Sequence, residues 1–387
     1  MFNKRTLKVI GIYMKTFALL GSNPYKWDEA NECVVECNSL SRKISFGFAV
    51  GHTVLYLAYL WWRLVQLLQT EKPSFPDVVW IYIWINLFQW SLTTFYNGHR
   101  KKSEVVPLFR GLKKLSTMLE KENPSARMKN LIWKFNIIDL NFLAAMWVPF
   151  IYNVSVTLMF IMIPTRVHYL YSLVSQENNR TSCLFQLFLM FEAYSKAAQS
   201  CMMGTDGFTV FPTLLSSGFW LDFTRKQKIS AAKKIRNFQR FHILMIYYNY
   251  AFTWLLMPVV FVWIPGSLII ACGFASIRFH SFLSFFEYIP FPVLVYNCCV
   301  ILAVTMHPAT IVYEESNKLY QTLLHDNNMS RRKSRLRRKE LAALRPFGVK
   351  IGFIQRVKKV AILVSYYFVS NHIFTMLITF PEDQINH

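Results

Sequence analysis

The last long apolar run of the chain, 360–380, is interrupted by polar side chains. Ser365, Tyr366, Asn371 and His372 all lie in this run, which is long enough to cross a bilayer as a helix. Hydroxyl, amide and imidazole groups cost free energy in hydrocarbon unless they find partners or face water. The pattern predicts a helix with one face toward water or toward polar groups of another helix.

A second polar pair, Glu192 and Lys196, lies inside another apolar run. Its spacing of four residues places both side chains on one face of a helix, where their charges can neutralise each other. The pair is either a structural ion pair or part of a ligand pocket. Trp84, Trp147 and Tyr152 are candidates for the pocket wall because they lie within apolar runs, although such residues also form interfacial belts.

The composition is that of a membrane protein. The chain has 387 residues, 53% hydrophobic and 17% aromatic, and a mean hydropathy of +0.26. Soluble domains are more charged, so we predict an all-α membrane protein in which 1–387 form a single polytopic domain. Cys33 and Cys37 have a helical spacing but lack the second pair that a zinc site needs, so we expect no metal and no cofactor.

Positive charge is concentrated in a few segments. The net charge is +22, and 37 of the 43 Lys and Arg residues lie in 1–43, 98–134, 223–240 and 316–359. Such clusters mark cytoplasmic loops, and they favour contact with anionic lipids over nucleic acid. We therefore expect no nucleic-acid partner and place all four segments on the cytoplasmic side.

These charges set the topology. The run 266–286 follows a Pro-Gly pair and contains charged residues, so we do not count it as a separate crossing. The prediction is seven transmembrane helices with a cytoplasmic N-terminus, an extracellular C-terminus and helices extended into a cytoplasmic anchor region. The approximate membrane segments are 44–65, 77–97, 135–163, 182–221, 241–272, 289–313 and 359–380.

Four local predictions accompany this topology. In the first 32 residues a short apolar patch lies among lysines, which predicts an amphipathic interfacial segment rather than a signal peptide. Gly204, Gly207 and Pro212 predict a break in the fourth helix, and 313–345 predict two helical pieces below the membrane. The sequon at Asn179 lies in a loop that the topology places outside, as expected of a glycosylated multi-pass protein of the plasma membrane.

One motif resembles a known family. Ser365-Tyr366, five residues, then His372-Ile373 is similar to the Thr-Tyr, five apolar residues, Gln-Phe signature in the last helix of the insect gustatory and odorant receptor superfamily. Tyr366 matches by identity, while Ser, His and Ile replace Thr, Gln and Phe. The resemblance in topology covers nearly the whole chain.

The resemblance implies a function. Members of this superfamily are tetrameric, ligand-gated, non-selective cation channels whose last helix lines the pore, so we expect a chemosensory receptor that binds a small chemical ligand as a homo- or hetero-tetramer. Val369, His372, Ile373 and Met376 lie on one helix face. We predict that they line the pore and that Ile373 forms a gate that closes by dewetting.

Two alternatives belong to other classes. A G-protein-coupled receptor would have its N-terminus outside, which would place the basic segments outside as well. A multipass acyltransferase-like enzyme would use a histidine such as His280 or His307, but neither has an acid at a helical spacing to orient it. We therefore do not expect an enzyme.

Overall fold

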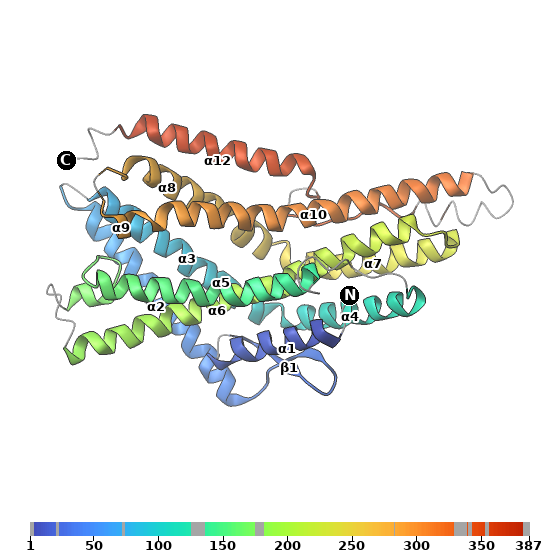
Figure 1. Ribbon diagram of the computed structural model, residues 1–387, viewed down its shortest axis with the longest axis horizontal. Helices are drawn as coiled ribbons and strands as arrows, with labels where there is room; N and C mark the ends of the chain where they lie inside the picture. The colour runs from blue at the N-terminus through green and yellow to red at the C-terminus, as the bar shows by residue number, and fades with distance from the viewer. Residues whose placement is uncertain are drawn as a thin grey trace.

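The computed structural model is a bundle of long helices that lie along a common axis (Figure 1). It describes residues 4–20, 23–71, 74–124, 136–174, 182–281, 283–328, 339, 343–352 and 356–381. In chain order the elements are α1 (Lys4–Leu19), β1 (Tyr25–Asp28), β2 (Cys33–Glu36), α2 (Leu40–Leu68), α3 (Phe75–Arg100), α4 (Lys102–Glu122), α5 (Ile137–Met162), η1 (Leu170–Leu173), α6 (Cys183–Lys226), α7 (Ala231–Phe252), the π-helix η2 (Leu256–Trp263), α8 (Ile264–Arg278), α9 (Phe285–Tyr288), α10 (Pro290–Asn328) and α12 (Lys359–Thr379). The strands β1 and β2 form an antiparallel hairpin.

The two ends of the bundle differ. One end, here called the connection end, holds the chain between α2 and α3, between α5 and α6 and between α8 and α10, together with the last turn of α12 (Figure 1). The other end, called the anchor end, holds α4, α7 and the second half of α10. The predicted helical piece ahead of Arg345 and the sequon at Asn179 lie outside the described residues.

Apolar helices dominate the bundle. Six helical stretches in the described part are long and apolar enough to cross a membrane: Leu40–Leu68, Phe75–Arg100, Ile137–Met162, Leu256–Arg278, Phe285–His325 and Lys359–Thr379. The helix α6 packs along α5, and its membrane-length part carries Glu192 and Lys196, which lower its hydropathy. The prediction of a mainly helical chain rich in membrane-length helices is confirmed, whereas the β1–β2 hairpin was not predicted.

The helices before α8 differ from the prediction. We expected one membrane segment over 241–272, whereas α7 ends at Phe252 and a new apolar stretch begins at Leu256. The face of α7 with Phe238, Leu244 and Met245 is buried against protein, and α7 packs on α4 at the anchor end. Hydropathy alone cannot tell an apolar face buried in protein from one in lipid.

The predicted break in α6 is wrong. The helix runs without interruption from Cys183 to Lys226. Its glycines serve close packing instead, because a Cβ atom on Gly204 would lie 3.1 Å from the ring of Phe17 and one on Gly207 would lie 3.2 Å from Ala145 Cβ. Neighbouring helices support a proline within a long membrane helix, which explains why Pro212 does not end it.

The helix α1 is amphipathic, as predicted, but its apolar face is buried in protein. Leu7, Ile10 and Phe17 are almost fully buried, and α1 packs against α5 and α6. Thr6 Oγ1 donates a hydrogen bond of 2.6 Å to Asp139 Oδ1, and the same carboxylate completes the N-terminal capping box of α5. The N-terminal segment is therefore fixed to the bundle by both apolar and polar contacts.

Candidate functional site

A buried ion pair lies within the bundle. Glu192 and Lys196 are each 1% exposed, and Glu192 Oε2 lies 3.5 Å from Lys196 Nζ. The hydroxyl of Tyr56, on α2, lies 2.8 and 3.0 Å from the two carboxylate oxygens of Glu192. A buried charge is tolerated only when it is paired and hydrogen-bonded, and Glu192 meets both conditions.

Aromatic rings surround the Lys196 ammonium. Its nitrogen lies 3.8 Å from the ring centroid of Trp84, 4.3 Å from that of Tyr56 and 4.5 Å from that of Phe88. Cations within about 6 Å of a ring face are attracted by the ring quadrupole. We call Tyr56, Trp84, Phe88, Glu192 and Lys196 the lysine cage; its members come from α2, α3 and α6.

The α5–α6 connection covers this cage. The His168 ring stacks on Trp80 and on Trp84, with centroids 5.5 and 5.7 Å apart and interplanar angles of 25°. Burial, and then the charges of Lys196 and Arg166, hold the pKa of His168 well below its usual range. His168 is therefore a neutral, stacked ring over the cage.

Arg166 holds this connection in place. Its guanidinium lies 3.2 Å from Asp77 at the start of α3 and also pairs with Glu287 of α9. Tyr59 of α2 donates to the carbonyls of Val167 and Tyr169, each at 2.9 Å. Three connections at one end of the bundle are thus bound together above the cage.

The four predicted pocket residues divide into two groups. Trp84 and Glu192 both belong to the lysine cage, and Tyr152 reaches its edge because its hydroxyl donates to Gln199 Oε1 at 3.3 Å. Trp147 is 56% exposed on the outer face of α5, away from these contacts. The structure therefore brings three of the four predicted residues to one region.

The motif tyrosine fastens α12 to its neighbours. Tyr366 donates through its hydroxyl to the carbonyl of Cys299 on α10 at 3.1 Å. Ser365 bonds only within its own helix, to the carbonyl of Ala361, and Arg278 at the end of α8 donates to the carbonyl of Leu377. These contacts hold α12 against α8 and α10.

Most of the predicted gate residues face the same subunit. Val369 is 5% exposed, Met376 is partly buried against the core, and Ile373 Cδ1 would lie 2.9 Å from a Cβ atom on Gly273 of α8. His372 differs because it is exposed, with Nδ1 2.8 Å from the carbonyl of Phe368. In the single chain, three of the four predicted pore residues pack on or beside α8.

The exposed side of α12 carries a line of polar groups. Asn371, His372, Thr375 and Thr379 are all exposed, and their spacing places them on one helix face. We call these four residues the polar stripe. His372 contacts the carbonyl of Phe368 in its own helix through Nδ1. The exposed amide of Asn371 and the second ring nitrogen of His372 still require water or a protein partner in a membrane-length helix.

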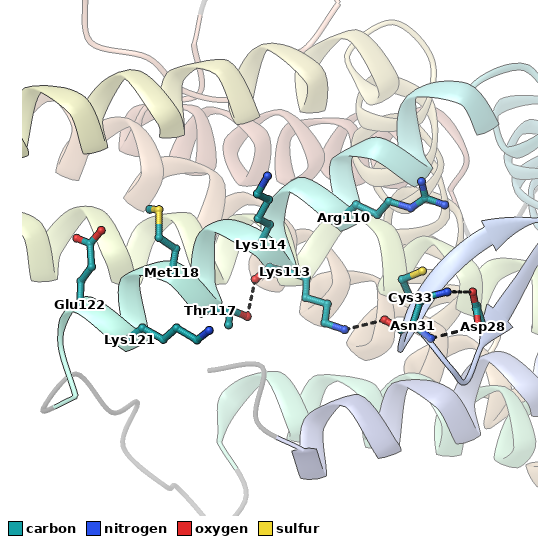
Figure 2. Close-up of a pocket in the computed structure, with 10 residues that line it drawn as sticks. All are labelled: Asp28, Asn31, Cys33, Arg110, Lys113, Lys114, Thr117, Met118, Lys121 and Glu122. Atoms are coloured by element: carbon teal, nitrogen blue, oxygen red, sulfur yellow. Dashed lines mark hydrogen bonds between the residues drawn. The ribbon is translucent and has the colours of Figure 1, made fainter.

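A basic groove lies between the β1–β2 hairpin and α4. Figure 2 shows this hollow of about 830 Å³, and its lining residues are Asp28, Asn31, Cys33, Arg110, Lys113, Lys114, Thr117, Met118, Lys121 and Glu122. Lys113 holds the hairpin by donating to the carbonyls of Asn31 and Glu32. The groove belongs to the basic segment 98–134 and lies apart from the lysine cage.

Comparison with known proteins gives the fold. No protein-family model matches the sequence, and no curated protein matches it in sequence. Two structures of the insect olfactory receptor OR5 from Machilis hrabei match it over 97% of this chain and 98% of theirs, at 13% identity. The TM-score is 0.65 for the complex with eugenol and 0.62 for the other structure. This chain has the insect olfactory receptor fold.

The resemblance inferred from the Tyr366 motif is thus confirmed at the level of this fold. Both neighbours are receptors rather than enzymes. The two histidines considered for acyl transfer, His280 and His307, are exposed, the first just after α8 and the second on α10. Tyr56 and His168 were missed, because no sequence pattern signals that α2 and the α5–α6 connection converge on α6.

Proposed function

We propose that this protein is a chemosensory receptor of the plasma membrane that acts as a ligand-gated, non-selective cation channel. Its N-terminus is cytoplasmic, its C-terminus extracellular, and four copies, or copies with related subunits, surround one pore lined by α12. The basic groove between the hairpin and α4 then faces anionic lipids of the inner leaflet. The olfactory receptor fold supports this class of function.

The polar stripe on α12 is the observation that carries the channel proposal. A helix that lines water can carry polar groups along one face, whereas a helix in lipid cannot do so without cost. Asn371, His372 and Thr375 occupy such a face and are exposed. In a tetramer this face turns toward the central axis, and the adjacent flank with Val369 and Ile373 remains on α8.

The gate remains a prediction. A ring of Ile373 side chains would close the pore by dewetting, but this requires α12 to turn away from Gly273 of α8, against which Ile373 packs. We propose that such a rotation accompanies opening or closing. Val369 and Met376, on the same face as Ile373, would turn with it.

We propose the lysine cage as the ligand site. It is buried between α2, α3 and α6 beneath the α5–α6 connection, and it contains two of the residues predicted from the sequence, Trp84 and Glu192. The receptor with the same fold binds a small molecule, eugenol. A small chemical ligand at this position would contact α3, which packs on α8, the helix that supports α12.

Reconstitution tests the proposal. Purified full-length protein is imaged as particles and incorporated into liposomes loaded with a potassium-sensitive dye, with a panel of volatile organic compounds added outside. We expect four-fold symmetric particles and compound-dependent cation flux. Monomeric particles that pass no ions with any compound would contradict it, whereas constant flux without added compound would retain the pore and reject ligand gating.

The gate is tested by comparing Ile373→Ser with Thr375→Ser in the same liposomes. If Ile373 closes the pore, Ile373→Ser hydrates the constriction and raises flux without ligand, and the conservative change on the polar stripe does not. Unchanged basal flux in correctly folded Ile373→Ser protein would reject the gate position.

A further inference from the structure

The lysine cage is surrounded by buried polar atoms that lack partners. In the described part of the chain these atoms are Trp84 Nε1, both ring nitrogens of His168, Tyr169 Oη, Ser195 Oγ and Gln199 Nε2, and Lys196 Nζ has no hydrogen bond of normal geometry. All of these side chains are at most 2% exposed. Native proteins leave few buried polar groups unpaired, and each such group requires an explanation.

The atoms belong to one region. Ser195, Lys196 and Gln199 follow Glu192 at spacings of three, four and seven, which is one face of α6. Trp84 contacts both the Lys196 ammonium and the His168 ring, and Tyr169 follows His168 in the chain. A single bound group could therefore reach several of them.

Hydrogen-bond donors are in excess. An ammonium, an indole N–H and an amide nitrogen such as Gln199 Nε2 can only donate. The oxygen of Gln199 already accepts from Tyr152. The main acceptor, the Glu192 carboxylate, is already occupied by the Tyr56 hydroxyl and by Lys196. A ligand that satisfies this site must bring an acceptor oxygen.

The charges favour a neutral ligand. Glu192 and Lys196 already cancel each other, and a further buried charge without a partner would cost several kcal/mol. The walls of the cage are the rings of Tyr56, Trp84 and Phe88, which suit a flat apolar body. Charge, donors and walls thus point to the same class of molecule.

We propose, on the basis of the ligand site proposed above, that the lysine cage recognises neutral small molecules in which an aromatic or other flat apolar body carries a carbonyl or similar acceptor oxygen. The oxygen of the ligand accepts hydrogen bonds from Lys196 and Trp84. Its flat apolar body packs against the rings of Tyr56, Trp84 and Phe88, in place of contacts that these rings make with one another. Carboxylates, amines and plain hydrocarbons are excluded, the first two by charge and the last by the unpaired donors.

Four probes with one phenyl body test this class: acetophenone, ethylbenzene, benzoate and benzylamine. Binding to full-length protein in nanodiscs is measured by saturation-transfer NMR and by ligand-dependent thermal shift, which need no channel activity. Loss of a hydrogen bond to a charged donor lowers affinity about 10-fold or more, so acetophenone should bind at least that much more tightly than the other three.

Two variants assign the effect to the cage. Trp84→Phe keeps a ring but removes the N–H, and should weaken acetophenone several-fold while leaving ethylbenzene unchanged. The neutral double variant Glu192→Gln/Lys196→Met keeps the Trp84 N–H, and should therefore reduce the preference for acetophenone over ethylbenzene several-fold without abolishing it. Lys226→Met, at the exposed end of α6, is the matched control and should keep the parent preference.

Several results would overturn the inference. These are equal binding of ethylbenzene and acetophenone by the parent, tighter binding of benzoate or benzylamine, an undiminished preference in the double variant, or no binding of any probe, which would assign the unpaired atoms to water. Flux in liposomes is recorded separately. Flux evoked by other compounds with no acetophenone preference rejects the ligand class alone, whereas selective binding without flux rejects the channel alone.

Discussion

The helices α3 and α12 have similar length and hydropathy, yet α3 is mostly buried in the bundle and α12 is mostly exposed on its outside. In α3, 72% of the most apolar window is buried, and in α12 only 6%. The polar groups near α3 are enclosed by protein, where an ion pair and stacked rings accommodate them. Those of α12 lie on the outside of the single chain. The polar groups of the interior are therefore enclosed by this chain itself, whereas those of α12 face outward.

The largest effect should come from breaking the interior pair. Glu192→Gln removes the negative charge and leaves Lys196 charged among aromatic rings, which should lower the free energy of unfolding by about 3–5 kcal/mol. Thermal melting of purified protein in detergent measures this loss. Adding Lys196→Met to the same protein should restore most of the stability, because no buried charge then remains.

Asp222→Asn is the control for that measurement. Asp222 pairs with Arg225 and Lys226 on the partly exposed last turns of α6, and exposed pairs contribute only about 0–1 kcal/mol each. If the Glu192→Gln protein has the same melting temperature as the parent and as Asp222→Asn, water must reach the Lys196 ammonium although the side chain is buried in the structure.

The neutral histidine over the cage should make stability depend on pH. Because the folded pKa of His168 lies below the unfolded value of about 6.5, the unfolded chain takes up a proton first as the pH falls. The folded state should therefore lose about 1 kcal/mol between pH 7.5 and 5.5 on account of this group. His168→Gln should remove that part of the slope.

Chemical denaturation at both pH values gives the slope. His280→Gln is the matched control, since its side chain is exposed after α8, and it should behave like the parent. If His168→Gln keeps the full parental slope, the ring is protonated in the folded state and the stacking on Trp80 and Trp84 needs another explanation.

The contact between α8 and α12 should be sensitive to a single methyl group. Gly273→Ala places a Cβ atom 2.9 Å from Ile373 Cδ1, whereas Gly266→Ala places one 3.9 Å from Val369 Cγ2. Both changes favour the helix equally, so Gly273→Ala should be about 1 kcal/mol less stable than Gly266→Ala. Shortening the partner, as in Gly273→Ala/Ile373→Val, should recover the difference; no recovery would mean that the two helices do not meet there.

The smallest effect on stability should come from the polar stripe. Asn371→Leu and Thr375→Val change exposed side chains, so the free energy of unfolding of the subunit should shift by no more than about 0.5 kcal/mol. Cation flux in liposomes should nevertheless fall several-fold if this face lines water. Phe374→Leu, on the apolar exposed side of α12, serves as the control. If Asn371→Leu, Thr375→Val and Phe374→Leu all reduce the flux equally, the polar stripe does not line the pore.

Much of the fold could be predicted from sequence because lipid imposes length and charge rules on each helix separately. Those rules located most of the membrane-length helices, and the motif around Tyr366 in the last helix indicated the fold. They failed at α7, because Phe238 and Leu244 face protein rather than lipid, and at α6, because neighbours support Pro212. Both failures concern contacts between helices, which hydropathy does not contain.

The candidate site was only half predictable. Glu192 and Lys196 stand out as charges in an apolar run, and Trp84 as an aromatic residue within one. Tyr56 and His168 join them only through the arrangement of α2 and of the α5–α6 connection, and Trp147 points outward because α5 lies at the edge of the bundle. On α12 the periodicity predicted that Val369, His372, Ile373 and Met376 share a pore-lining face, which stays a prediction. In the chain Val369 is buried and Ile373 lies against Gly273 of α8, a contact that the sequence of α12 alone does not indicate.

The bond between Thr6 and Asp139 spans 133 residues, and this separation has a consequence for synthesis. At ribosomal speeds of about 5–20 residues per second, α1 leaves the ribosome on the order of ten seconds before its partners on α5 exist. During that interval its apolar face, with Leu7, Ile10 and Phe17, has only the membrane surface to cover it. The first helix made therefore cannot complete its docking until α5 has been made.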